Sequence, residues 1–175
     1  MPRALRLALV AVAAVAVLGL LAVGASALLD RPATVMTTSS TVPGPKQEVW
    51  DALTDLQGYG DWNPVVTSAA GELREGGELD LRVELPGHEP DDVEASVLIY
   101  RPERKLRWQE RLVLPGLEDW EYEFILEPVD GGRVLVVQHL RIEGLLSPFA
   151  DEDAAREALD LMAAALDERL AGAQR

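Results

Sequence analysis

The sequence contains no cysteine, so disulfide bonds, thiolate catalysis and cysteine-ligated metals are all excluded. Histidine is almost as scarce. The chain has two, His88 and His139, and their separation in sequence argues against a zinc site. Basic residues are outnumbered, with 16 Lys and Arg against 30 Asp and Glu, which gives a net charge of −14. A surface of this sign repels phosphate backbones, so we do not expect nucleic-acid binding.

The motifs of several catalytic and binding classes are also missing. The chain has no Gly-rich phosphate-binding loop, no nucleophile elbow and no calcium-binding loop. The acidic run at 151–153 lacks the spacing and the glycine of a calcium loop, and it suits the positive end of a helix dipole. We therefore expect neither a metal ion nor a cofactor.

The N-terminal region carries the longest apolar run of the chain. Residues 7–29 contain no charged side chain and follow Arg3 and Arg6. As a helix, this run is long enough to cross a hydrocarbon core of about 30 Å, and the basic flank should stay in the cytoplasm. A cleavable signal peptide is the alternative, because 25–27 (Ala-Ser-Ala) fits a cleavage site. We predict that 1–31 is a membrane anchor or signal peptide. The domain is then extracytoplasmic at the cell membrane with a single pass, or secreted after cleavage.

The remainder, 32–175, has the pattern of one α+β domain. A Thr- and Val-rich stretch at 33–42 predicts a first strand, and two short helical segments follow at 46–53 and 55–61. Apolar residues then alternate with polar ones in segments separated by Gly and Pro. These predict six further strands, at 65–70, 78–85, 93–101, 106–114, 120–127 and 133–143. No helix interrupts the six, so we expect an antiparallel meander and not a parallel βαβ sheet.

The C-terminal segment predicts a long amphipathic helix. Ser147 and Pro148 are typical of a helix start, and five apolar residues then recur at helical spacing, namely Ala155, Leu159, Met162, Leu166 and Leu170. A helix with one apolar stripe that follows a one-faced sheet should pack across that sheet.

These elements and several short motifs resemble the SRPBCC superfamily, which includes START domains, birch-pollen-allergen-like proteins and bacterial polyketide cyclase/dehydrase-like proteins. The motifs are 49–55 (Val-Trp-Asp-Ala-Leu-Thr-Asp), 62–64 (Trp-Asn-Pro), 106–108 (Leu-Arg-Trp) and 144–146 (Gly-Leu-Leu). The resemblance implies a helix-grip fold, in which a curved seven-stranded antiparallel sheet surrounds a long C-terminal helix and leaves an apolar cavity. It does not imply one activity.

The chain departs from the bacterial relatives that it resembles at four positions. Those relatives often have histidine where Tyr122 stands, histidine and glutamate near Gln138 and Leu140, and asparagine where Ala163 stands. The loss of these polar groups predicts a drier cavity and casts doubt on the chemistry that they support.

Strand alternation predicts which side chains face the helix. Three polar residues, Glu110, Tyr122 and Gln138, interrupt the apolar set. Glu110 is either a general acid or base, a ligand contact, an ion-pair partner of an arginine, or turned to solvent by a bulge. Tyr122 and Gln138 either contact a ligand or satisfy each other. The predicted ligand-binding set is Trp108, Glu110, Tyr122, Phe124, Gln138, Leu140, Met162 and Leu166.

Three functions are compatible with this pattern. The first is a non-enzymatic binding or carrier module for a small apolar ligand, such as a lipid, a quinone or a polyketide-like compound, held between the sheet and the C-terminal helix. The second is a polyketide cyclase/dehydratase-like enzyme that uses Glu110 and Tyr122 for proton transfer. The third is an interaction protein whose cavity is filled by its own side chains. The sequence favours the first, and an enzymatic activity stays open.

Overall fold

The chain divides into two units, Met1–Pro32 and Ala33–Arg175. A computed structural model describes residues 33–111 and 116–173, which all belong to the second unit. The predicted anchor or signal peptide at 1–31 lies outside the described residues. Within the described ranges, no helix is both long and apolar enough to span a membrane.

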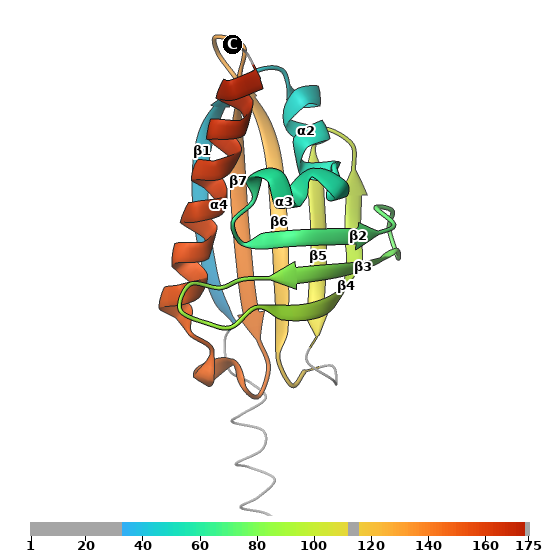
Figure 1. Cartoon of the computed structure of the whole chain (residues 1–175), viewed down its shortest axis with the longest axis vertical. Helices are drawn as coiled ribbons and strands as arrows, with labels where there is room; N and C mark the ends of the chain where they lie inside the picture. Colours follow the sequence, from blue (N-terminus) through green and yellow to red (C-terminus); the bar gives the residue numbers. More distant parts are fainter. Residues whose placement is uncertain (1–32, 112–115, 174–175) are drawn as a thin grey trace, which may run out of the picture. The chain divides into compact units, whose positions relative to one another are not determined.

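Seven antiparallel strands form one sheet in the order β1-β7-β6-β5-β4-β3-β2 (Figure 1). Their bounds are β1 Thr34–Pro43, β2 Val66–Gly71, β3 Glu78–Val83, β4 Asp91–Arg101, β5 Lys105–Arg111, β6 Asp119–Val129 and β7 Arg133–Glu143. Strands β2 to β7 pair in chain order, as expected for strands joined by short turns. The first strand pairs with the last, in a register that runs from Thr34 opposite Ile142 to Pro43 opposite Arg133. The predicted antiparallel meander is confirmed.

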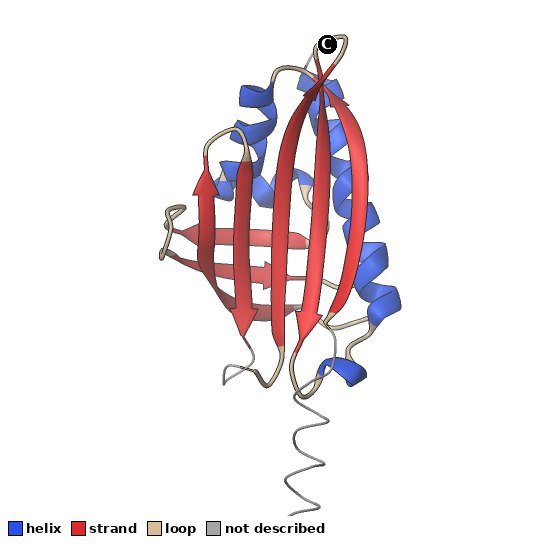
Figure 2. Ribbon diagram, turned by 180° about the vertical axis from the view of Figure 1, so that it is seen from behind, coloured by secondary structure: helices blue, strands red, loops and turns tan. Residues whose placement is uncertain are grey.

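The sheet is strongly curved. Figure 1 shows β2, β3 and β4 crossing in front of β5 and β6 at a steep angle, and in Figure 2 the same strands cross behind. The register shifts between Val66 and Ser68 in β2 and between Val97 and Ile99 in β4, and irregularities of this kind bend a strand. The curvature produces a concave inner face, and all the helices lie on that side (Figure 2).

The described part of the chain contains five helical segments. They are α2 Lys46–Thr54, the 3₁₀ turn η1 Leu56–Gly58, α3 Tyr59–Trp62, the 3₁₀ turn η2 Ser147–Phe149 and α4 Glu152–Ala173. Helix α4 runs along β1 (Figure 1). All five residues of its predicted apolar stripe are buried, with exposed fractions of 4% or less. This burial is why the long helix stays on the sheet.

The start of α4 differs from the sequence prediction. Ser147 and Pro148 form the separate turn η2, because Ala150 is extended (φ −63°, ψ 140°) and breaks the helical path. The Ser147 hydroxyl donates to the Gly144 carbonyl oxygen at 2.9 Å and does not cap the helix. Asp151 takes that place, since its carboxylate accepts the Ala154 N–H at 3.0 Å.

The segment between α2 and β2 is fixed by buried aromatic and amide groups. Trp50 packs edge-on against Tyr100 with ring centroids 5.4 Å apart, and the Tyr59 hydroxyl donates to the Leu53 carbonyl oxygen at 2.9 Å. The buried Asn63 side chain accepts the N–H groups of Val65 and Val66, both at 2.9 Å. Asn63 therefore shapes the turn into β2.

Candidate functional site

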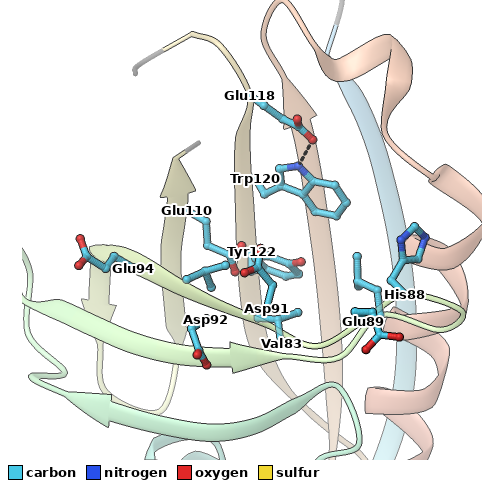
Figure 3. Close-up of a pocket in the computed structure, with 12 residues that line it drawn as sticks. Val83, His88, Glu89, Asp91, Asp92, Glu94, Glu110, Glu118, Trp120 and Tyr122 are labelled. Carbon is cyan, nitrogen blue, oxygen red and sulfur yellow. Dashed lines mark hydrogen bonds between the residues drawn. The ribbon is translucent and has the colours of Figure 1, made fainter. Parts of the chain in front are cut away.

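A pocket of about 650 Å³ lies on the inner face, between the β3–β4 pair and the β5–β6 pair (Figure 3). One wall comes from the end of β3, the β3–β4 loop and the start of β4: Val83, Leu85, His88, Glu89, Asp91, Asp92, Val93 and Glu94. The other wall comes from β5, β6 and the turn before β6: Glu110, Glu118, Trp120 and Tyr122. The curvature of the sheet creates this space, because it turns β3 and β4 over the face of β5 and β6.

The β3–β4 loop, residues 84–90, is shaped by a turn of its own and is bound to the start of α4 by one side-chain contact. The His88 N–H donates to the Leu85 carbonyl oxygen at 3.0 Å, which closes a tight turn around Gly87. Gly87 has φ +78°, a conformation that side chains with a Cβ rarely adopt. The His88 ring Nε2 lies 3.1 Å from Asp151 Oδ2, so the loop is bound to the first turn of α4. This contact connects the pocket wall to the long helix.

Glu110 lies on β5, opposite Ala95 of β4 and Trp120 of β6. Its side chain is half-buried and makes no hydrogen bond or ion pair with any described residue. Burial raises the pKa of Glu110 from 4.5 to about 8, and the negative charge of Asp91 adds to the shift. The carboxyl is therefore largely protonated at neutral pH, and it titrates in the range where general acids and bases work.

Tyr122 lies next to Glu110 on the pocket wall (Figure 3). It is 7% exposed, and its hydroxyl has no hydrogen-bond partner within 33–111 and 116–173. Burial raises the pKa of Tyr122 well above its usual value, and the charge of Glu110 adds to this effect. The hydroxyl is thus a neutral donor that is free to bind a ligand group.

Two of the eight predicted ligand-binding residues, Glu110 and Tyr122, line the pocket. The other six are buried in the core with exposed fractions of 2% or less: Trp108, Phe124, Gln138, Leu140, Met162 and Leu166. Trp108 stacks on Tyr122 at 5.9 Å and packs against Phe124 at 5.4 Å, so it supports the pocket wall from inside the core. The ligand-binding role of these six residues stays a prediction.

The geometry reduces the number of roles open to Glu110, Tyr122 and Gln138. Glu110 has no arginine partner among the described side chains, and the β5 register is regular at its position. Tyr122 and Gln138 do not satisfy each other. Both polar atoms of the Gln138 amide are buried without a hydrogen-bond partner in the described part of the chain.

Sequence reasoning missed the acidic side of the pocket. Glu89 lies in a loop, Asp91 at the end of a strand and Glu118 in a turn. Strand alternation does not predict the direction of side chains at such positions. The only available signal was the density of acidic residues at 89–94. Over the described ranges, no group of three or more His, Asp or Glu side chains is arranged to hold a metal ion.

Comparisons with known proteins agree on the fold. The family described as polyketide cyclase / dehydrase and lipid transport matches residues 33–173. A START superfamily protein from Mycobacterium smegmatis superposes with a TM-score of 0.65 at 19% identity, covering 79% of this chain and 97% of that protein. The Zhui aromatase/cyclase from Streptomyces sp. R1128 superposes with a TM-score of 0.61 at 20% identity, covering 82% and 97%.

A plant protein has the same architecture. Major latex-like protein 151 from Panax ginseng superposes with a TM-score of 0.65 at 9% identity, covering 79% of this chain and 97% of the ginseng protein. No curated protein matches the chain significantly. Structural likeness at these identities establishes the architecture and leaves the activity to be argued from the pocket.

Proposed function

Because the chain belongs to the polyketide cyclase/dehydrase and lipid-transport family, within the SRPBCC superfamily, we propose that its domain binds a small, largely apolar molecule in the pocket between β3–β4 and β5–β6. The observation that carries the proposal is the pocket itself. Its volume of about 650 Å³ falls in the range of about 300–1,000 Å³ typical of small-molecule sites. This volume counts against the hypothesis of a cavity filled by its own side chains.

The lining chemistry supports a ligand with an apolar body. Val83, Leu85, Val93 and Trp120 contribute apolar surface to both walls. Glu110 and Tyr122 add two polar groups without hydrogen-bond partners among the described residues, and such groups fix the orientation of a ligand. A lipid, a quinone or a polyketide-like compound has this mixture of a large apolar part and a few polar atoms.

A second candidate function is proton-transfer catalysis of the cyclase or dehydratase type. The observation in its favour is that Glu110 and Tyr122 lie in one pocket and that the pKa of Glu110 is raised to about 8. In its ionised form, which becomes more populated as the pH rises toward 8, the carboxyl can take a proton from carbon next to a carbonyl, while the Tyr122 hydroxyl donates a hydrogen bond to the carbonyl oxygen. Turnover of a polyketide-like substrate that falls about a hundredfold or more in Glu110→Gln, with affinity retained, is the result expected of this candidate.

Native mass spectrometry of the purified domain tests the binding function. We expect a co-purified small molecule on the parent protein and its loss in Val93→Trp, because the larger ring fills the pocket. Val35→Trp is the matched control, since Val35 is 59% exposed on β1, and it should keep the ligand. Both variants should retain the circular dichroism of the parent. A ligand that stays bound to a folded Val93→Trp protein would contradict this site.

We also propose that residues 7–29 hold the domain at the outer side of the cell membrane, or direct its secretion. The support is the uncharged run behind Arg3 and Arg6.

A further inference from the structure

The pocket has an unbalanced charge. Six of the described residues that line it are acidic, and none of the described lining residues is Lys or Arg. Asp92 is neutralised by Arg82 at 2.8 Å and, like Glu94, points away from the centre of the pocket in Figure 3. The other four, Glu89, Asp91, Glu110 and Glu118, have no basic ion-pair partner in the described part of the chain. The pocket therefore carries negative charge, from Glu89, Asp91 and Glu118 and from Glu110 when it is ionised, that the described side chains do not balance.

The outer face of the same strands is different. Lys105 pairs with Glu123 at 2.7 Å, and Arg107 pairs with Glu121 at 2.8 Å. These carboxylates alternate along β6 with Trp120 and Tyr122, which line the pocket. Glu121 and Glu123 on the outer face of β6 are thus paired with basic side chains, whereas the four pocket carboxyls have no basic partner among the described residues. The negative charge of the pocket is a local feature and not only a consequence of the net charge of −14.

Two aromatic groups lie beside the unpaired carboxyls. Tyr122 is more than nine-tenths buried, and its hydroxyl lies at the pocket wall without a partner in the described ranges. The Trp120 indole N–H donates to Glu118 at 2.7 Å, which fixes the ring against the pocket (Figure 3). Carboxylates beside the faces of aromatic rings are the surroundings in which proteins bind organic cations.

We propose that the ligand of this pocket is an organic cation: an apolar body that carries a protonated or quaternary amine, with Glu110 and Asp91 as its counter-ions. The inference rests on the proposed binding function of the same site and specifies the class of ligand. The apolar body contacts Val83, Leu85 and Val93, and the positive group lies between the two carboxyls and the Tyr122 ring.

Binding of a cation should be coupled to the loss of a proton. Burial and the charge of Asp91 hold the pKa of Glu110 at about 8, and a neighbouring positive charge favours the ionised carboxylate. Affinity for a cation that does not itself titrate should therefore rise as the pH increases through about 8. The other titratable groups around the pocket are His88, Glu89, Asp91, Asp92, Glu94, Glu118 and Tyr122. His88→Gln serves as a control for the contribution of that lining residue.

A pair of probes of equal shape tests the inference. One is a naphthylethyl trimethylammonium ion, and the other is its neutral analogue, in which a tert-butyl group replaces the trimethylammonium group. Calorimetry with the full chain in detergent, at constant ionic strength and pH 9, should give about tenfold or greater preference for the cation. The preference should shrink at pH 6.5, and proton release should appear as a dependence of the heat on the buffer at pH 7.5.

The variants Glu110→Gln and Asp91→Asn should reduce the preference for the cationic probe over the neutral probe to within about twofold. Glu127→Gln is the matched control, because it removes the same charge from an exposed position outside the pocket and should keep the preference. Equal affinity for both probes at pH 9 would overturn the cation inference and leave the binding function standing. Failure of both probes to bind, together with no co-purified molecule, would overturn both.

Discussion

Acidic side chains on the two faces of β5 and β6 illustrate how burial decides the behaviour of a carboxyl group. Glu121 and Glu123 lie on the outer face beside Arg107 and Lys105. Glu110 lies on the inner face, where removal from water favours the neutral acid. The same residue type is therefore a surface ion-pair partner on one face and a titrating group near neutral pH on the other.

The raised pKa of Glu110 makes the stability of the domain depend on pH. Between pH 4.5 and about 8 the folded state binds more protons at this site than the unfolded state, so the free energy of unfolding falls as the pH rises. Glu110→Gln removes this dependence. Because the carboxyl is half-buried and water in the pocket weakens the effect, we expect the variant to be more stable than the parent by roughly 1–3 kcal/mol at pH 9 and about equal at pH 4.

Urea unfolding from pH 5 to pH 9 measures this difference. A parent whose stability is flat across the range, or a variant that is less stable at pH 9, would show that Glu110 has a partner that keeps it ionised.

Gln138 is the second residue whose surroundings do not match its chemistry. Its amide is 1% exposed, and neither polar atom has a hydrogen-bond partner in the described part of the chain. An unsatisfied buried polar group costs about 1–3 kcal/mol. Gln138→Met, which keeps the size and removes the polar atoms, should therefore raise the free energy of unfolding by about that amount. Gln47→Met, at an exposed position of α2, should change it by less than about 0.5 kcal/mol.

At the scale of elements, helix α4 is held by its apolar stripe. Met162 is 1% exposed in the core, and truncation to alanine should lower the free energy of unfolding by about 2–5 kcal/mol. The neighbouring Leu161 is 42% exposed and provides the matched control, because Leu161→Ala should cost less than about 0.5 kcal/mol. Chemical denaturation of the two variants measures the difference. Equal losses would mean that α4 packs through a different face.

Local patterns predicted these elements well, and their limits are also local. Alternation located every strand to within a few residues, and the 155–170 stripe identified the buried face of α4. The predicted start of α4 was several residues too early, because the extended Ala150 separates η2 from the helix. No pattern of side chains in the sequence predicts that backbone conformation. The periodicity of apolar residues predicts that an element exists and which of its faces is buried, whereas the residues at which the element begins and ends depend on individual backbone torsion angles.

The pocket could be predicted only in part. Strand alternation correctly placed Glu110 and Tyr122 on the inner face. The helical stripe added Met162 and Leu166, which are buried in the core and whose ligand-binding role stays a prediction. Which part of the inner face stays uncovered depends on the curvature of the sheet and on the position of α4 along β1. Both arise from contacts between segments far apart in sequence. Asp91 and Glu118 enter the site through that curvature and carry no local signal.

At the scale of the whole molecule, the proposed location of the chain can be tested directly. The uncharged run at 7–29 predicts that the full-length protein fractionates with membranes and that residues from 33 onward lie outside the cytoplasm. Protease added to spheroplasts should digest the domain, while a cytoplasmic marker survives. Replacement of two central residues of the run, Val15→Arg and Leu18→Arg, should abolish membrane association. Full protection of the domain in spheroplasts would reverse the orientation.

The curved sheet that forms the pocket walls has an evolutionary consequence. All twelve lining residues fall within one contiguous stretch, from Val83 to Tyr122. The framework made by β1, β7 and α4 lies outside that stretch. A single recombination event between relatives can therefore replace every lining side chain and leave the framework intact. The residues that determine ligand preference in such a protein can therefore be inherited together as one segment. A library of chimaeras in which residues 83–122 are exchanged would produce proteins with different ligand preferences on one unchanged framework.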